Sequence, residues 1–257
     1  MEEINFGGIV PFSTIDWRGK AVMVLFLRRC PFRCIYCQNY NLLEDDNYVE
    51  MQEIEESIMK NVDFIDAVVL SGGEPFMQPR AIEKITRFAK KCSLFVAVQT
   101  NGFYPEIIES MLKKEEKLID KIFLDIKAPL SDEDQYEKLT KTRNAAERVR
   151  NTLNICLRAK IDLELVTTVF KNLVGAGEVK HIAQELEEAG AAYHPYVIQQ
   201  GRIELAPGGE LKEEDVFSHD ELKELATIAY HAALLKDVRI RTREGGEEVI
   251  YRRTRRS

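Results

Sequence analysis

Residues 21–37 read AVMVLFLRRCPFRCIYC, an apolar run that is followed directly by three cysteines. The apolar run predicts a buried strand over residues 21–27. Cys30, Cys34 and Cys37 then lie in one loop with the spacing Cys-x3-Cys-x2-Cys. Three thiolates in a single loop can ligate three irons of a 4Fe-4S cluster and leave the fourth iron without a protein ligand. The loop therefore predicts an iron–sulfur cluster with one iron open to chemistry.

Apolar and amphipathic stretches alternate along the rest of the chain, as is typical of parallel strands joined by crossover helices. We predict strands at residues 21–27, 66–71, 94–100, 121–126, 162–169 and 193–199, and helices at residues 51–61, 79–91, 105–113, 145–158 and 178–188. About six βα units follow from this order. Such units form either an open doubly wound sheet or a partial barrel, and the periodicity does not choose between them.

Polar or glycine-rich groups follow the predicted strands at the points where the strands end. In both architectures ligands bind at the carboxyl ends of the strands, so these groups are expected to share one site. Besides the cysteine loop they are Ser71-Gly72-Gly73-Glu74-Pro75, Gln99-Thr100-Asn101-Gly102, Asp125-Ile126-Lys127 and Gln199-Gln200-Gly201. Independent turns would not explain so many polar strand ends.

Composition narrows the class of protein. The chain has 257 residues, 45% of them hydrophobic, which suffices for one sizeable core. The 5 cysteines are odd in number and mostly concentrated in one loop, which favours metal or redox chemistry over a disulfide framework. Without a long apolar run or a signal peptide, we expect a cytoplasmic protein that does not insert into a membrane. The net charge of -7 argues against general nucleic-acid binding.

The pattern changes after Gly201. A turn signal at residues 206–209 precedes a predicted helix over residues 219–235 and a predicted strand over residues 238–242. We expect a barrel over residues 1–205 and an appendage over residues 206–257 that is not an independent domain. The end of the chain carries seven arginines, namely Arg239, Arg241, Arg243, Arg252, Arg253, Arg255 and Arg256. We favour a solvated, partly frayed tail, and the alternative is a docking strip for an acidic partner.

The cysteine spacing, the aromatic Tyr36 before the last cysteine, and the Gly-Gly-Glu motif after the second strand resemble the signature of the radical S-adenosylmethionine (SAM) superfamily. The resemblance implies a partial (βα)6 TIM-like barrel with a small C-terminal helix and strand appended. Three segments narrow the resemblance to one group within the superfamily. They are residues 7–17 (GGIVPFSTIDW), residues 33–39 (RCIYCQN) and Asp125-Ile126-Lys127. Together they resemble the activating proteins of glycyl radical enzymes, most closely the activators of anaerobic ribonucleoside-triphosphate reductase.

The resemblance implies roles for the residues of the cysteine loop. Cys30, Cys34 and Cys37 would ligate the 4Fe-4S cluster, and SAM would chelate the open iron through its amino and carboxylate groups. Tyr36 would lie against the adenine.

Roles for four further segments are implied in the same way. Gly72 and Gly73 would let the backbone approach the methionine moiety, and Glu74 would accept hydrogen bonds from its ammonium group. Asn101 would reach the ribose or the partner. The aspartate and lysine of Asp125-Ile126-Lys127 would face the cofactor, with the lysine near its carboxylate.

The chain departs from the family pattern at three positions. Many relatives have an arginine where this chain has Val166, and valine cannot bind a carboxylate, so Lys127 or an arginine from elsewhere would take that task. Arg18 and Arg29 stand where relatives commonly have proline and glycine. These changes concern the substrate-facing part of the site.

The activity implied by the resemblance is reductive cleavage of SAM to methionine and a 5′-deoxyadenosyl radical. That radical would abstract the Cα hydrogen of one glycine on anaerobic ribonucleotide reductase, with a flavodoxin or ferredoxin as electron donor. Two alternatives remain open: a radical SAM enzyme acting on a small metabolite or a modified nucleoside, and a non-catalytic metal-bound interaction module.

Simpler interpretations of single residues also remain open. The cysteines could hold zinc, although a closed zinc site needs a fourth ligand. Asp125 and Lys127 share one strand face and could be a plain ion pair. Cys92 and Cys156 are expected to be small core residues.

Overall fold

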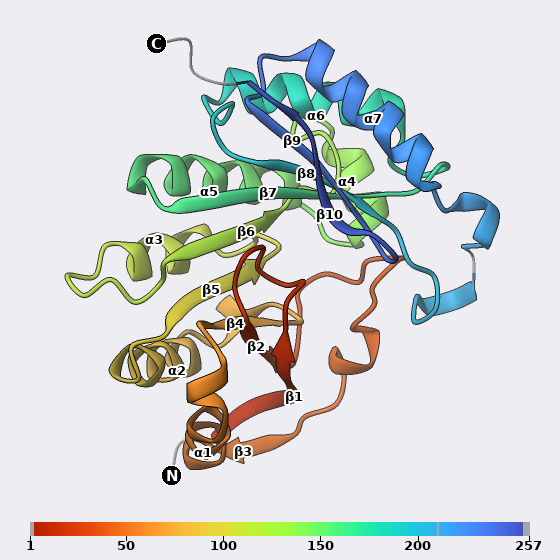
Figure 1. The fold of residues 1–257 in the computed structure, drawn as a ribbon. Coiled ribbons are helices and arrows are strands. Elements are labelled where there is room, and N and C mark those ends of the chain that lie inside the picture. The colour runs from red at the N-terminus through yellow and green to blue at the C-terminus, as the bar shows by residue number, and fades with distance from the viewer. Residues whose placement is uncertain (1–2, 210, 254–257) are drawn as a thin grey trace.

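The computed structural model describes residues 3–209 and 211–253 (Figure 1). Its strands form one sheet of ten in the order β10-β9-β8-β7-β6-β5-β4-β2-β1-β3. The strands are β1 (Glu3–Ser13), β2 (Val22–Leu27), β3 (Tyr48–Glu50), β4 (Ala67–Gly72), β5 (Phe95–Thr100), β6 (Lys121–Asp125), β7 (Asp162–Val169), β8 (Tyr196–Gln200), β9 (Asp237–Thr242) and β10 (Gly246–Arg252).

Seven α-helices occur in the described residues, most of them as crossovers between neighbouring strands. They are α1 (Met51–Asn61), α2 (Pro79–Lys91), α3 (Pro105–Leu112), α4 (Glu133–Thr140), α5 (Ala145–Ala159), α6 (Ala176–Glu188) and α7 (His219–Ala232). Short 3-10 turns are η1 (Tyr40–Leu42), η2 (Val62–Phe64), η3 (Pro75–Met77), η4 (Pro207–Gly209) and η5 (Glu213–Asp215). No helix in the described part of the chain is long and apolar enough to span a bilayer.

The strand order decides between the two architectures that the sequence left open. β2, β4, β5, β6, β7 and β8 are neighbours in chain order and run parallel, and β9 continues them in the same direction. A doubly wound sheet would reverse its order part of the way along the chain, whereas winding in a single direction curls a twisted sheet into a barrel. The sheet ends at β10 and β3 rather than closing on itself. The predicted partial barrel is confirmed.

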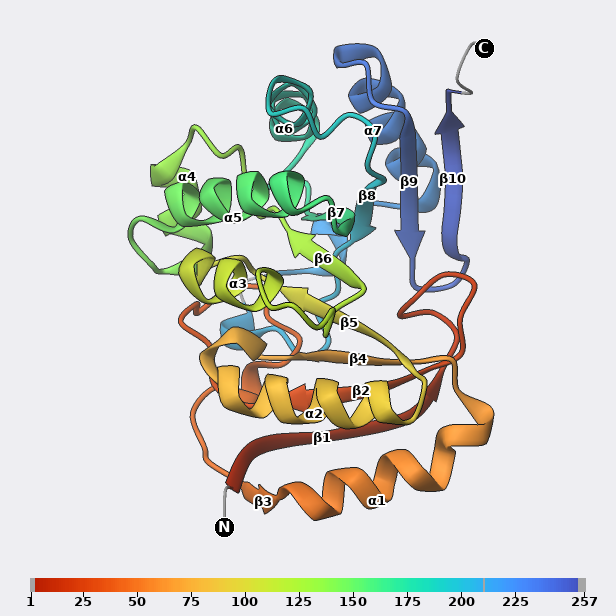
Figure 2. The same cartoon turned by 90° about the vertical axis from the view of Figure 1, so that its left-hand side faces the viewer.

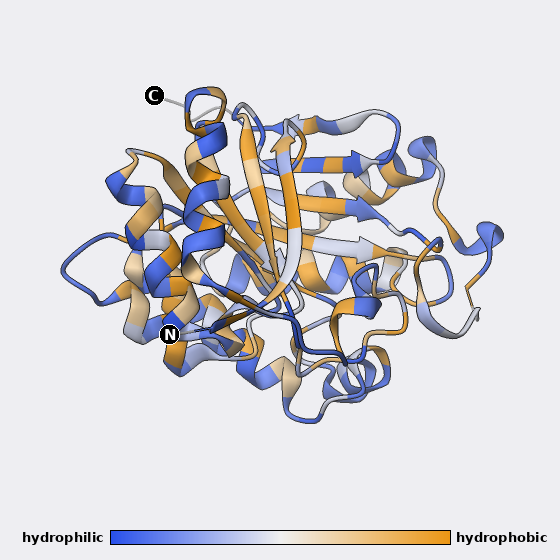
Figure 3. Ribbon diagram, turned by 90° about the horizontal axis from the view of Figure 1, so that it is seen from below, coloured by the Kyte–Doolittle hydropathy of each residue, from blue (hydrophilic) through white to orange (hydrophobic). Residues whose placement is uncertain are grey.

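The helices cover one face of the sheet, and Figure 2 shows α2, α3 and α5 lying side by side in front of the strands. In Figure 3 the strands are mainly hydrophobic along their length, while the helices alternate between hydrophobic and hydrophilic residues. That alternation is expected for helices that bury a single stripe. A second, smaller core lies on the opposite face of the strands, where the ring of Trp17 meets Phe123 edge to face at 6.2 Å. The sheet is therefore covered on both faces, as parallel sheets require.

Most predicted elements are confirmed to within a few residues, and α1 and α2 have the predicted bounds. The strand predicted over residues 193–199 begins three residues later, at Tyr196, and α7 ends at Ala232 instead of residue 235. Sequence patterns missed β1, β3, α4 and β10. β1 contains two glycines and a proline, and β10 and α4 are mostly polar. β1 and β3 pair with each other across more than 40 positions of the chain, which local periodicity does not record.

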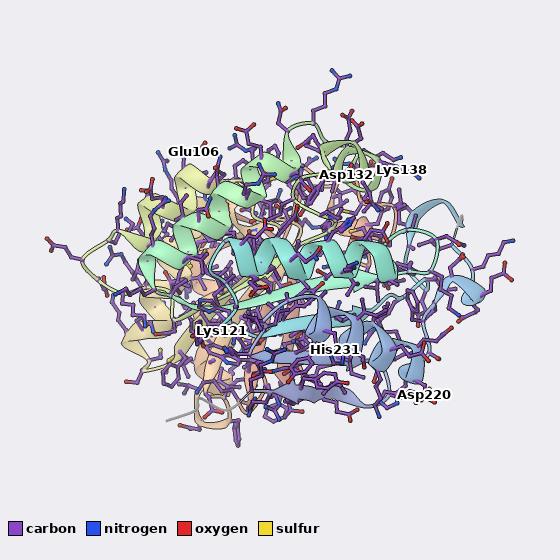
Figure 4. All side chains as sticks on the ribbon, turned by 90° about the horizontal axis from the view of Figure 1, so that it is seen from above. Glu106, Lys121, Asp132, Lys138, Asp220 and His231 are labelled. Carbon is purple, nitrogen blue, oxygen red and sulfur yellow. The ribbon has the colours of Figure 1, made fainter. Side chains whose placement is uncertain are left out.

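The prediction of a solvated arginine tail is wrong for the strand β9. The guanidinium groups of Arg239 and Arg241 form buried ion pairs with Glu247 of β10 at 2.8 Å and 2.6 Å. Arg241 also binds Glu164 of β7 at 2.7 Å, and Lys121 of β6 binds the same carboxylate at 3.1 Å. Figure 4 places Lys121 toward the middle of the molecule, away from its periphery. These arginines hold the C-terminal hairpin onto the sheet.

The remaining arginines divide into two groups. Arg243 pairs with Glu204, Arg252 pairs with Asp237, and Arg253 lies over the ring of Tyr230. Arg255 and Arg256 lie outside the described residues, so the predictions made for them stay predictions.

Candidate functional site

A cavity of about 270 Å³ opens at the carboxyl ends of the barrel strands. Nearly every strand from β2 to β9 contributes to its wall, either directly or through the loop that follows the strand. Of the predicted site residues, nine line it: Cys30, Cys34, Tyr36, Cys37, Gly72, Gly73, Asn101, Asp125 and Lys127. Glu74 does not line it. The structure thus brings together residues that are almost 100 positions apart in the sequence.

The cysteine loop is fixed by backbone hydrogen bonds to the end of α4. Arg33 N donates to Thr140 O at 2.8 Å, and Ile35 N donates to Leu139 O at 3.2 Å. The loop is therefore held by a helix that follows it by more than 100 residues and that sequence patterns did not predict.

Cys34 is buried, Cys30 and Cys37 are half-buried, and the chemistry of this donor set fits an iron–sulfur cluster. Burial raises the pKa of Cys34 to about 11, and it also raises the pKa of Cys30 and Cys37 above the usual thiol value. Without metal these thiols are protonated near neutral pH, so thiolate ligation of iron must release protons.

Zinc fits the arrangement less well. Among residues 3–209 and 211–253, no three His, Cys, Asp or Glu side chains are arranged to hold a metal ion. Zinc requires ligands that converge on a single ion. In a cluster each thiolate binds a different iron, so the sulfurs need not converge.

The structure shows a steric requirement for Gly72 and Gly73, and their predicted contact with the methionine moiety stays a prediction. Gly72 has a φ of +115°, and a Cβ atom built on it would lie 2.3 Å from Leu27 O. A Cβ atom on Gly73 would lie 2.0 Å from Arg29 O. The backbone here passes directly against the end of β2, where Gly73 N donates to Leu27 O at 2.8 Å. These glycines therefore join the β4 loop to the start of the cysteine loop.

Glu74 is fully buried and is not among the residues that line the cavity, and its predicted contact with an ammonium group stays a prediction. Its Oε1 atom accepts hydrogen bonds from Phe76 N at 3.0 Å and Thr100 Oγ1 at 2.8 Å. Its Oε2 atom accepts one from Asn101 N at 2.8 Å. Burial raises the pKa of Glu74 to about 7 in spite of these donors. Glu74 ties the ends of β4 and β5 together.

Asn101 is directed at a cysteine rather than into open space. Its Oδ1 atom accepts a hydrogen bond from Phe103 N at 3.0 Å, which fixes the orientation of the side chain. Its Nδ2 atom then donates to Cys30 Sγ at 3.3 Å. The predicted contact with the ribose or the partner stays untested, and the structure adds a contact with a cysteine of the loop.

Asp125 and Lys127 are an ion pair and also line the cavity, so the two interpretations of these residues are compatible. Lys127 Nζ lies 2.6 Å from Asp125 Oδ2 and 5.3 Å from the centre of the Tyr36 ring. Although burial opposes its charge, the neighbouring Asp125 raises the pKa of Lys127 above the usual lysine value. Asp125 Oδ1 and the Tyr36 hydroxyl have no hydrogen-bond partner in the described part of the chain.

Several residues of the cavity region were not predicted as site residues, among them Arg241, Gln38 and Asn39. Arg241 reaches the wall from β9 and donates to Gln199 Oε1 at 3.2 Å. Gln38 Nε2 donates to Arg202 O, and Asn39 Nδ2 donates to Gly72 O, both at 2.8 Å. Gln38 and Asn39 directly follow Cys37, so their place beside the cysteines was a usable signal. Nothing local in the sequence marks Arg241.

Comparison with known proteins assigns the family. The Radical SAM superfamily model matches residues 24–192, which include the cysteine loop and the strands β4 to β7. The chain belongs to the radical SAM superfamily. The predicted resemblance is confirmed, and the chain is an enzyme.

Curated relatives of this radical SAM enzyme include three informative proteins. It is 33% identical over 249 residues to a predicted glycyl-radical enzyme activating enzyme of Methanocaldococcus jannaschii, covering 94% of this chain and 98% of the relative. It is 29% identical to the pyruvate formate-lyase-activating enzyme of Staphylococcus aureus, covering 50% of this chain and 54% of that one. It is 27% identical to the 7-carboxy-7-deazaguanine synthase of M. jannaschii, covering 70% and 77%.

Solved structures share the fold of this radical SAM enzyme at low sequence identity. A radical SAM methyltransferase from Sphaerobacter thermophilus matches with a TM-score of 0.69 and 10% identity, covering 89% of this chain and 68% of that one. Streptococcus suis SuiB bound to S-adenosylmethionine matches with a TM-score of 0.58 and 14% identity, covering 79% and 44%. Members of the superfamily use a 4Fe-4S cluster and SAM, and these are the cofactors of this enzyme.

Proposed function

We propose that this enzyme installs a glycyl radical on a partner protein. The observation that carries the proposal is the match to the M. jannaschii relative over nearly the whole length of both chains. The proposed partner is anaerobic ribonucleoside-triphosphate reductase. This choice rests on the motifs in residues 7–17, residues 33–39 and Asp125-Ile126-Lys127. A flavodoxin or ferredoxin is the proposed electron donor.

The cavity provides the parts that such an enzyme needs. Cys30, Cys34 and Cys37 are proposed to hold the cluster, and Tyr36 with the Asp125–Lys127 pair is proposed to bind SAM. When bound, the cluster and SAM supply one electron and a carbon-centred radical that abstracts hydrogen. The residues proposed to hold these groups come from the cysteine loop and the strand ends, and apolar wall residues such as Phe123 and Val166 would limit access of water.

Electron paramagnetic resonance (EPR) tests the proposal directly. The reconstituted enzyme is mixed without air with the reductase of the same host, SAM and a reductant. We expect a glycine-centred doublet, together with one equivalent of 5′-deoxyadenosine per radical formed. The absence of a doublet with every glycyl radical protein of the host would contradict the proposal.

Cysteine variants distinguish the cysteines proposed to bind the cluster from the other cysteines in the same assay. We expect Cys34→Ser to lose iron and SAM cleavage because a ligand of one iron is removed. Cys92→Ser is the matched control, since Cys92 is far from the cavity lining and contacts Met59. Equal iron content and activity in both variants would contradict the proposal that Cys34 is a ligand of the cluster.

A small molecule is the second candidate substrate, and one observation favours it. The relative named 7-carboxy-7-deazaguanine synthase covers 70% of this chain. If that candidate is correct, a metabolite in a cell extract of small molecules will stimulate 5′-deoxyadenosine formation without any partner protein. If only the protein fraction stimulates it, this candidate fails.

A further inference from the structure

A second hollow of about 610 Å³, here called the C-terminal groove, lies next to the cysteine cavity. One wall is the loop that follows β8, including Arg202 and Ile203, and another is the turn between β9 and β10, including Arg243 and Glu244. Its lining also includes Glu213 and the start of α7. In Figure 1 the loop after β8 and the β9–β10 turn both lie on the right-hand side, as does the loop after β2. The groove residues lie outside the part of the chain that the family model matches.

A single short segment separates the C-terminal groove from the cysteine cavity. Gln200 and Arg202 belong to the linings of both. Gln200 Nε2 donates to Phe217 O at 2.8 Å, and Gln200 Oε1 accepts from Arg243 N at 3.0 Å, so this side chain joins two walls of the groove. On the other side, Arg202 O accepts the hydrogen bond from Gln38 beside the cysteine loop. A molecule in the groove therefore lies one segment away from the cysteine cavity.

The charges of the C-terminal groove disfavour a polyanion. The cations Arg202 and Arg243 are offset by three carboxylates, those of Glu204, Glu213 and Glu244. Arg243 is moreover paired with Glu204. Nucleic-acid sites need an excess of positive charge to displace counterions from phosphates. The groove instead combines apolar and polar groups with nearly balanced charges, so it suits a ligand of small net charge, such as a polypeptide segment.

We propose that the C-terminal groove holds a polypeptide segment of the partner enzyme, and that the target residue extends from it past Gln200 and Arg202 into the cysteine cavity. This inference rests on the proposed function and adds the place where the partner docks. The radical is formed inside a cavity of about 270 Å³, which cannot enclose a protein. A flexible segment can enter this cavity only if the rest of its chain is bound close to the cavity opening. The C-terminal groove provides that binding site.

Bulky substitutions at the edge of the groove test the inference. Glu213 and Glu244 are exposed, and in the described part of the chain neither side chain forms a hydrogen bond or ion pair. We expect Glu213→Trp and Glu244→Trp to weaken activation of the partner by at least about tenfold, because the indole fills space that the segment needs. Glu188→Trp is the matched control, since Glu188 is equally exposed but lies at the end of α6.

Two readouts distinguish failure of the docking site from failure of the proposed function. SAM cleavage driven by reductant alone, without partner, should be unchanged in all three variants, because none of the three substituted residues lines the cysteine cavity. If the wild-type enzyme forms a glycyl radical and the two groove variants form it with unchanged dependence on partner concentration, the inference is wrong. If the wild-type enzyme forms no radical on any partner, the proposed function and this inference fail together.

Cross-linking locates the bound segment. A photoreactive amino acid placed at position 244 should cross-link to the partner within the segment that carries the target glycine. A cross-link confined to a distant region of the partner, or to RNA, would overturn the inference.

Discussion

At the scale of single residues, the cavity is built by side chains that hold other groups in place. Asn101 is the clearest case, because one end of its amide is fixed by Phe103 N and the other donates to Cys30 Sγ at 3.3 Å. Hydrogen bonds to the sulfurs of a cluster raise its reduction potential, since they stabilise the more negative reduced state. Asn101 is therefore expected to set how readily the cluster accepts an electron.

We predict that Asn101→Leu shifts the midpoint potential of the reconstituted cluster to a more negative value. The leucine is of similar size and cannot donate a hydrogen bond. An EPR-monitored redox titration measures the potential. Thr168→Val is the control, because Thr168 lines the same cavity but forms no hydrogen bond with a cysteine in the described chain. Equal potentials in the wild type and Asn101→Leu would show that the contact has no electronic effect.

Gly73 gives a second prediction at this scale. A Cβ atom there would lie 2.0 Å from Arg29 O, so Gly73→Ala must push the start of the cysteine loop away from β4. We expect a loss of up to about 3 kcal/mol in the free energy of unfolding, together with poor iron incorporation. Urea titration and iron analysis measure the two effects.

Gly177→Ala provides the matched control for Gly73→Ala. Gly177 lies in α6, and no heavy atom comes within 4 Å of a Cβ atom built on it. Alanine in a helix is favoured over glycine by about 1 kcal/mol, so this variant should be as stable as the wild type or more stable. The interpretation of Gly73 fails if both glycines tolerate alanine equally.

At the scale of elements, the β9–β10 hairpin is the part that local patterns described least well. Its arginines were expected to be solvated, yet Arg239 is buried and Arg241 is half-buried, and they pair with Glu247 and with Glu164 of β7. Glu164 is more than 70 positions away in the sequence, so no local pattern could pair it with Arg241. The two strands that carry these residues, predicted over residues 162–169 and 238–242, were nevertheless placed well, because each has its own apolar alternation.

Stability at acid pH tests this network. Burial alone would raise the pKa of Glu247, but Arg241 and Arg239 outweigh it and hold that pKa below the usual glutamate value. A carboxylate with a lowered folded-state pKa stabilises the fold above its unfolded-state pKa, and this contribution is lost as the pH falls through the folded-state pKa. We therefore expect the unfolding free energy to fall below about pH 4.5.

The variant Glu247→Gln separates this contribution from general acid effects. It should be less stable than the wild type at pH 7, and the difference between the two should shrink on acidification. Urea midpoints at several pH values measure it. A difference that stays constant or grows as the pH falls would contradict the role of the ion pairs.

At the scale of the whole molecule, the barrel and the C-terminal segment share one sheet. β9 pairs in parallel with β8, and α7 packs beside α6. We therefore predict that residues 206–257 do not fold independently and that the full chain unfolds in a single thermal transition. A chain ending at residue 205 lacks the arginines of β9, so Glu164 would keep only Lys121 as a buried ion-pair partner. We therefore expect that shortened chain to lack the transition. Two separate transitions in the full chain would contradict this.

The sequence by itself determined the family, the cysteine ligands proposed for the cluster, and the alternation of strands and helices in the barrel apart from α4. These depend on spacings within one loop and on apolar periodicity within one element, and both are local properties of a chain. Only the tertiary structure decided that the sheet is an open barrel, that Glu74 is buried and does not line the cavity, and that Arg241 reaches the cavity wall from β9. Those features depend on which distant residues meet when the sheet curls. Packing, and not the neighbours in sequence, sets how deeply a side chain is buried and which charged groups it contacts.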